Sequence, residues 1–129
     1  MTQEDKELLA KDLFSRALSG IKVNYRGDIY TLGYNMYLEH SDMAFESYPM
    51  KYFLDNVDEV KPYLRSMSSM TEEEQRTLDS MCNGVEMVSR LSGLKMFDKA
   101  FDWLIEHHFD YHGLIKKGLA LEAPEGMYK

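Results

Sequence analysis

Residues 21–38 of the chain read IKVNYRGDIYTLGYNMYL, and this stretch decides the fold class. Apolar and polar residues alternate from Ile21 to Tyr25, a period of two that is typical of a strand with one buried face. Gly27 can supply the positive φ that a tight turn requires. The alternation then resumes and continues to Leu38. The sequence therefore predicts a hairpin with a long return strand and one apolar face suited to packing against a helix.

A helix is expected before the hairpin. Thr2 can cap its start, with Asp5 three residues further on in a variant of the capping box. Gly20 is expected to end it, because glycine tolerates the positive φ found just beyond a helix. The apolar face repeats at helical spacing and consists of Leu9, Leu13, Phe14, Ala17 and Leu18.

Two further helices are expected in the second half of the chain. Thr71 and Glu74 form a full capping box for the first of them, and Gly93 is expected to end it. The other is expected from about Lys95 to His107. The predicted inner faces are Leu78, Met81, Cys82, Val85 and Val88 in the first helix, and Phe97, Ala100, Phe101 and Leu104 in the second.

The segment over 60–65 is predicted to be extended, after a short helix or a single helical turn that includes Val57. Pro62 has no N–H to donate, which favours an edge strand or a strand start. From about residue 119 onward, turn-forming residues predict a partly docked tail. The 129 residues are therefore expected to form a single α+β domain: an N-terminal helix, a small antiparallel sheet or hairpin, and two or three helices packed on it.

Composition narrows the functional classes. Cys82 is the only cysteine, which excludes an intramolecular disulfide and fits a reducing compartment. The acidic N-terminus is unlike a secretory signal, and no stretch reaches the roughly 18 apolar residues of a membrane span. We therefore expect a cytoplasmic protein without membrane attachment. The net charge of −7 disfavours binding to nucleic acid, while mimicry of DNA charge stays an alternative.

One cluster has the residue types of a metal site: His107, His108, Asp110 and His112. His108 and His112 would share the face of a helix, whereas His108, Asp110 and His112 would share the face of a strand. Histidines near a helix C-terminus also interact favourably with the helix dipole, and we favour this explanation. We accordingly expect no metal and no cofactor.

A second group of candidates lies where the extended segment meets a helix start. Backbone N–H groups at such an end can hold an anion, and Arg65 could add a charge-assisted contact. The alternative, which we favour, is a cap and a brace between elements. Thr71 and Glu74 already satisfy two of those N–H groups, and the neighbouring carboxylates repel an anion. The candidate binding residues are Tyr63, Arg65, Ser68 and Ser69.

Two strings in the C-terminal half carry a resemblance. They are KPYLRSMSSMTEEE at 61–74, and DWLIEHHFDYHGLI at 102–115, which leads into GLALEAPEGMY at 118–128. These strings resemble signature segments of a family of small proteins from phages and mobile elements of gut bacteria. In that family's usual pattern a proline follows the equivalent of Arg65, and an arginine stands where His112 is; this chain has Ser66 and His112. The resemblance implies a setting in the host cytoplasm and no established activity.

No set of residues identifies a reaction. Cys82 falls on an apolar helix face, where a thiol is usually inert. The serines lack a nucleophile elbow, and the chain has no glycine-rich phosphate loop. Whether the protein is an enzyme is left open, and a non-enzymatic role is favoured.

Aromatic residues and methionines suggest an interaction module. The chain has nine tyrosines, six phenylalanines and ten methionines, more than a small core is expected to bury in full. Tyrosine is also enriched at interfaces. Tyrosines partly outside the predicted core faces are Tyr25, Tyr37, Tyr48 and Tyr52. The leading hypothesis is a phage accessory protein that binds another protein or itself. The alternative is a small enzyme or ligand-binding protein that uses the Tyr63–Arg65 region or the His107–His112 cluster.

Overall fold

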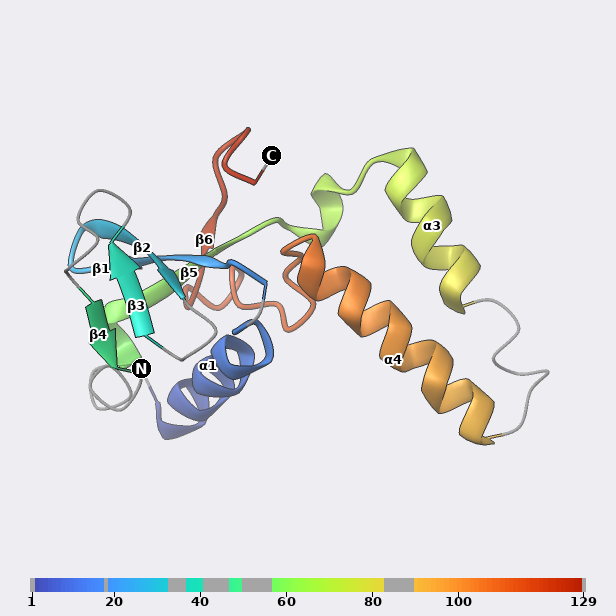
Figure 1. Cartoon of the computed structure of the whole chain (residues 1–129), viewed down its shortest axis with the longest axis horizontal. Coiled ribbons are helices and arrows are strands. Elements are labelled where there is room, and N and C mark those ends of the chain that lie inside the picture. The colour runs from blue at the N-terminus through green and yellow to red at the C-terminus, as the bar shows by residue number, and fades with distance from the viewer. Residues whose placement is uncertain are drawn as a thin grey trace.

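The computed structural model describes residues 2–17, 19–32, 37–40, 47–49, 57–82 and 90–128. In chain order its elements are helix α1 (Gln3–Ser15), strands β1 (Lys22–Tyr25), β2 (Asp28–Leu32), β3 (Tyr37–His40) and β4 (Ser47–Pro49), the 3-10 turn η1 (Val57–Glu59), strand β5 (Val60–Leu64), the 3-10 turn η2 (Met67–Ser69), helices α3 (Glu72–Cys82) and α4 (Arg90–Glu106), and strand β6 (Leu121–Glu122). The described residues thus confirm the predicted α+β class: an N-terminal helix, a sheet and further helices (Figure 1).

The strands form one mixed sheet in the order β4-β3-β2-β1-β5-β6. Its neighbouring pairs are antiparallel except β5 and β6, which are parallel. The predicted turn between β1 and β2 is confirmed. Tyr25 pairs with Asp28, and the two residues between them, Arg26 and Gly27, have φ values of 53° and 88°. Two positive φ values in a two-residue loop give a turn whose twist matches that of the strands.

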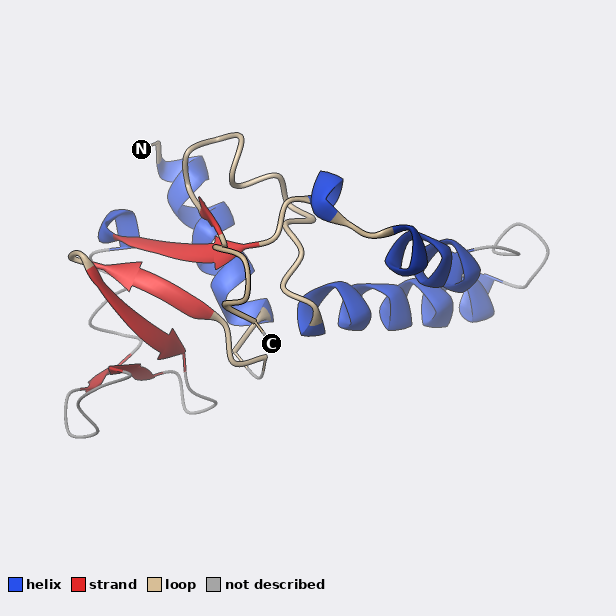
Figure 2. Ribbon diagram, turned by 90° about the horizontal axis from the view of Figure 1, so that it is seen from above, coloured by secondary structure: helices blue, strands red, loops and turns tan. Residues whose placement is uncertain are grey.

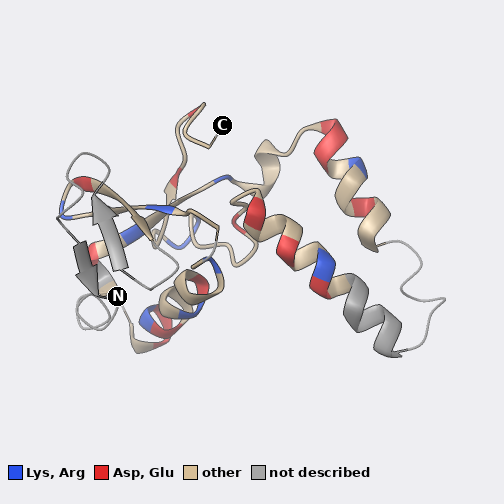
Figure 3. Ribbon diagram, viewed as in Figure 1, with Lys and Arg blue, Asp and Glu red and all other residues tan. Residues whose placement is uncertain are grey.

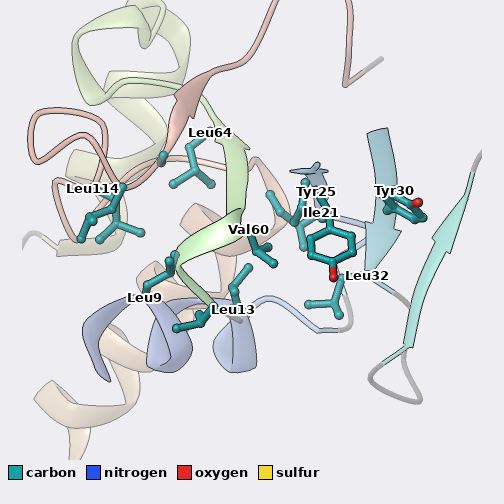
Figure 4. Close-up of a cluster of buried hydrophobic side chains, with 13 residues drawn as sticks. Leu9, Leu13, Ile21, Tyr25, Tyr30, Leu32, Val60, Leu64 and Leu114 are labelled. Carbon is teal, nitrogen blue, oxygen red and sulfur yellow. The ribbon is translucent and has the colours of Figure 1, made fainter. Parts of the chain in front are cut away.

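The core lies between α1 and the sheet (Figure 4). Leu9 and Leu13 of α1 are fully buried, as their helical spacing predicts. Alternate residues of the strands meet them, among them Val23 of β1 and Leu64 of β5. Leu114, from the loop after α4, enters the same cluster. The core therefore joins the C-terminal segment to the N-terminal helix and sheet.

The predicted return strand is wrong in its length. β2 ends at Leu32, and β3 runs antiparallel to it with Leu38 opposite Leu32. Facing residues of an antiparallel pair point to the same side of the sheet. A period of two can therefore continue through a reversal of the chain, so the alternation could not distinguish one long strand from two short ones.

Strand β5 forms where the sequence predicts an extended segment, and η1 is the helical turn before it. Pro62 suggested that this segment is an edge strand. That prediction is wrong for the last two residues of β5, because they pair with β6. β6 is paired only with Tyr63 and Leu64, however. No described strand pairs with Pro62 on the side away from β1. The missing N–H of this proline therefore costs no sheet hydrogen bond on that side.

Helices α3 and α4 pack against each other and extend away from the sheet (Figures 1 and 2); we call this pair the helical arm. Thr71 and Glu74 make both hydrogen bonds of the predicted capping box, at 3.1 and 3.0 Å. The prediction that Gly93 ends a helix is wrong. Gly93 lies inside α4, which begins at Arg90. An internal glycine costs about 1 kcal/mol relative to alanine, and a long helix that packs against a neighbour tolerates this cost.

The buried faces of the helices are narrower than predicted. On α4, Ala100 and Leu104 are buried, but Phe97 and Phe101 are 44% and 48% exposed. On α1, Phe14 is 49% exposed. α3 has no fully buried residue. The predictions were wrong at the phenylalanines because helical spacing shows which residues share a face, not how wide a face the neighbouring layer covers. Predicted apolar-face positions outside the described residues are Leu18, Tyr34, Met36, Val85 and Val88.

Replacement of a core leucine should measure how far the fold depends on the sheet. Leu64→Ala is expected to lower the free energy of unfolding by about 2–5 kcal/mol, because it leaves a cavity at a fully buried position. Met67→Ala, at a 39% exposed position three residues away, should change it by less than about 1 kcal/mol. Urea denaturation followed by circular dichroism compares the two. Equal effects would contradict the burial described.

Candidate functional site

The loop after α4, residues 107–119, is where separate parts of the chain meet. Its backbone pairs with the end of β5: the N–H of Arg65 donates to the carbonyl of His108, and the N–H of Asp110 donates to the carbonyl of Arg65, both at 2.8 Å. The buried carboxylate of Asp110 accepts hydrogen bonds from two backbone N–H groups further along the loop, at 2.7 and 3.0 Å. Asp110 therefore holds the backbone of the loop in place. The two hydrogen bonds that its carboxylate accepts offset the cost of burying it.

A buried ion network joins this loop to α1. Asp12 and Arg16 have no exposed surface, and Arg16 donates from Nε to Asp12 Oδ2 at 2.9 Å and from Nη2 to Oδ1 at 3.2 Å. His112 Nδ1 lies 2.7 Å from Asp12 Oδ1, and it must be the donor because a carboxylate only accepts. Arg16 Nη2 also donates to the carbonyl of Phe109, at 2.7 Å. One carboxylate and one guanidinium thus hold the loop at two positions.

Sequence reasoning missed this network. Asp12 and Arg16 share one helix face with Leu9 and Leu13, since the four positions follow the spacing i, i+3, i+4 and i+7. Charged residues on a buried stripe are the signal that could have identified them. A pair of opposite charges four residues apart is also typical of a solvent-exposed helix face, however. Only the contact with the distant loop distinguishes the two cases.

His108 occupies an unusual environment. Its backbone is left-handed (φ 62°), its ring stacks on Tyr128 with the centroids 3.7 Å apart, and its Nδ1 has no hydrogen-bond partner among the described residues. Burial, together with the positive charge of Arg16, lowers the pKa of His108 from 6.5 to about 4. The Tyr128 hydroxyl donates to the carbonyl of Tyr63 at 2.7 Å and accepts from the N–H of Lys22 at 2.9 Å. These hydrogen bonds attach the C-terminal segment to β1 and β5, and the ring stack attaches it to the loop after α4.

The histidine cluster proposed from the sequence does not converge on one point. His112 belongs to the buried ion network, Asp110 binds backbone N–H groups of its own loop, and His108 stacks on an aromatic ring. His107 Nδ1 lies 2.9 Å from the backbone carbonyl oxygen one turn earlier in α4. Among the described residues, no group of three or more His, Cys, Asp or Glu side chains could hold a metal ion.

Arg65 forms a brace between β5 and α3. Its two terminal nitrogens donate to Glu74 Oε2 and Oε1, at 2.9 and 2.7 Å, and its guanidinium carbon lies 4.2 Å from the centre of the Phe109 ring. The hydrogen bond from Arg65 holds the pKa of Glu74 at about 2, below its usual 4.5. The charge of this guanidinium is therefore already paired within the protein.

A hollow of about 510 Å³ lies beside the brace. Arg65 and Ser69 line it, whereas the other two candidate residues bond elsewhere: Tyr63 accepts from the Asn24 amide at 3.2 Å, and Ser68 bonds a neighbouring serine hydroxyl at 3.0 Å. Two carboxylates and one already paired cation make this hollow unfavourable for an anion. The remaining lining residues are Thr71, Glu122, Ala123, Pro124, Glu125, Gly126 and Tyr128.

A second hollow, of about 290 Å³, lies between the ends of α1 and α4, which are side by side in both views (Figures 1 and 2). Its lining residues are Phe14, Ser15, Ser19, Asp102, Ile105 and Glu106. Phe101 lies one helical turn before Ile105, and Phe97 one turn before Phe101, so an exposed aromatic stripe continues from the hollow along α4. We call the surface formed by Phe14, Phe97, Phe101 and Ile105 the apolar groove.

Comparison of the chain with protein-family models, curated proteins and solved structures found no match. No helix in the described part of the chain is long and apolar enough to cross a membrane. The two hollows, and the loop that joins α4 to the sheet, are therefore the basis for inferring function.

Loss of the network carboxylate should strongly destabilise the protein. Asp12→Ala leaves the buried Arg16 without its counter-charge, and breaking a buried pair in this way costs about 3–5 kcal/mol. Glu7→Ala removes an exposed acid from the same helix and should cost less than about 0.5 kcal/mol. Urea denaturation at pH 7 measures both. A cost for Asp12→Ala below 1 kcal/mol would show that the network is not buried as described.

Stability should also depend on the protonation of His108. Between pH 6.5 and about 4, the unfolded chain binds a proton that the folded protein excludes, so stability falls as the pH falls through this window. The slope from this group is at most about 1.4 kcal/mol per pH unit. His108→Asn removes the titration and keeps a residue that tolerates positive φ. Its unfolding free energy should be less dependent on pH between 6.5 and 4, and an unchanged slope would refute the assignment.

Proposed function

We propose that the chain is a non-enzymatic accessory protein that acts by binding another protein through the apolar groove. The observation that carries this proposal is that Phe14 of α1 shares a hollow with Ile105 of α4, and that Phe101 and Phe97 follow one and two helical turns away along α4, with each of the three phenylalanines nearly half exposed. Isolated apolar side chains are ordinary on a protein surface, but a contiguous apolar patch indicates a contact site. Phenylalanine is also enriched at protein interfaces.

The helical arm supports the same proposal. It extends from the sheet (Figure 2). Its first helix, α3, has no fully buried residue. Isolated helices of this length are marginal in water, and most helical stability in proteins comes from burying an apolar face. A protein partner on the arm would add the layer that the sheet does not supply.

The tyrosines named from the sequence do not contribute to this argument. Tyr25, expected partly outside the core, is only 1% exposed, so that expectation is wrong. Its place in the core follows from the same alternation that buries Val23 two residues earlier. Tyr52 lies outside the described residues, and for Tyr37 and Tyr48 the structure describes only the backbone.

We further propose that the partner belongs to a bacterial host and that the protein acts in the host cytoplasm, within a phage or mobile-element setting. The strings at 61–74 and 102–128 support the setting through their resemblance to phage-associated proteins. The single cysteine is consistent with a reducing compartment.

Binding of a small ligand in the hollow beside Arg65 is the second candidate function. Its volume of about 510 Å³ is within the range of small-molecule sites, roughly 300–1,000 Å³. Glu122 and Glu125 in its lining favour a cation over an anion.

Thermal unfolding in the presence of spermidine or ATP, each at about 1 mM, tests the ligand site. Under this second candidate, spermidine should raise the melting temperature by a few degrees, because a ligand that binds only the folded state stabilises it. ATP should not, and E122Q/E125Q should abolish the spermidine effect. No shift in the wild-type protein, or an equal shift in E122Q/E125Q, would count against the site.

Capture of a partner tests the leading proposal. Tagged wild-type protein, incubated with nuclease-treated host lysate, should retain a stoichiometric protein partner. F97S/F101S should lose it, because removing interface aromatics costs about 2 kcal/mol or more, roughly thirtyfold in affinity. Ile29→Ser, at a 37% exposed position on β2, is the matched control and should retain the partner. A column that elutes only this chain, or equal capture by F97S/F101S, would contradict the proposal.

A further inference from the structure

Acidic side chains border the apolar groove along α4. Asp98, Asp102 and Glu106 are exposed and recur every four residues, each one position after an apolar residue of the groove. Figure 3 shows that acidic positions recur along α4. Residues four apart lie on the same side of a helix, so the three carboxylates form one stripe beside the apolar one. None of them forms an ion pair with the side chains that the structure describes, which on α4 are those from Phe97 onward.

The acidic stripe is unfavourable for α4 itself. The C-terminal end of a helix carries a partial negative charge, which cations stabilise and anions destabilise. The last turn of α4 has no basic residue, and Asp102 and Glu106 add negative charge at this end. Positions that oppose a local stability rule are expected at functional or strained sites.

We propose that the apolar groove binds a basic amphipathic helix of the partner protein. This inference rests on the proposed function and specifies the chemistry of its partner. One large apolar side chain of that helix would enter the hollow between Phe14 and Ile105, since about 290 Å³ suits a single side chain better than a whole small molecule. Lysine or arginine residues on the next helical turns would meet Asp102 and Glu106, an arrangement typical of helix-in-groove recognition.

Charge distinguishes this occupant from the alternatives. The chain has a net charge of −7, so a second copy would bring like charges together across the groove. The phosphates of nucleic acid and of anionic lipids would be repelled in the same way. A basic helix would instead be attracted at long range and oriented by the stripe.

A model peptide tests the chemistry directly. The probe is a 14-residue peptide with leucine and lysine at helical spacing, and the control peptide has glutamate in place of each lysine. The lysine peptide should bind the wild-type protein at least tenfold more tightly than the glutamate peptide. D102K/E106K should weaken this binding at least tenfold, and the neutral variant D102N/E106Q should have an intermediate effect. Both variants are expected to fold, because they remove acids from the negative end of α4.

The matched control distinguishes binding in the groove from a general electrostatic attraction between the peptide and the acidic protein. E122K/E125K changes the net charge by the same amount at two acids that line the other hollow, and it should alter the affinity less than threefold. No binding of the lysine peptide, or equal losses in D102K/E106K and E122K/E125K, would overturn the inference.

The captured partner distinguishes this inference from the broader proposal. If wild-type protein and D102K/E106K capture the same host protein equally, the binding function stands and the basic helix is wrong. If neither captures any protein, the binding function itself fails. If only wild-type protein captures a partner, and a basic helical segment of that partner competes for the groove, both stand.

Discussion

The arrangement of α1 and the loop after α4 depends on the hydrogen bonds of the buried Asp12 carboxylate. This carboxylate lies on the first helix, yet it binds His112 from the loop after α4 at 2.7 Å, and through Arg16 it reaches the backbone of Phe109. Transfer of charges out of water is costly, and only close geometry with further hydrogen bonds offsets that cost. Burial of these charges therefore requires α1 and the loop to pack together.

The same loop connects the network to the arm. Phe109 stacks on Trp103 of α4 with the ring centroids 5.7 Å apart and receives the guanidinium of Arg65 on its ring. Tyr111 extends the connection to the groove: its hydroxyl lies 2.9 Å from Ser15 Oγ, and its ring centroid lies 5.6 Å from that of Phe101. The surface proposed to bind a partner is thus held in place by the contacts that fix the fold. A change in the network would be expected to alter the groove as well.

Local patterns predicted the local structure well, and contacts between distant residues account for what they missed. The turn at Gly27 and the cap at Thr71 depend on neighbouring residues alone, and both are present. The reversal between β2 and β3 was missed because the antiparallel partners Leu32 and Leu38 are six residues apart, an even spacing through which a period of two continues. The burial of Asp12 depends on a residue 100 positions away, which no local pattern contains.

Acidic residues of this chain fall into two groups with different consequences. Asp12, Asp110 and Glu74 are each satisfied inside the protein, by a guanidinium, by backbone N–H groups or by both. Asp102 and Glu106 have no ion-pair partner among the described residues and oppose the dipole of their own helix. The first group explains the fold. The second group is unexplained by the fold, and its position beside exposed phenylalanines makes an external cation the simplest physical reason for it.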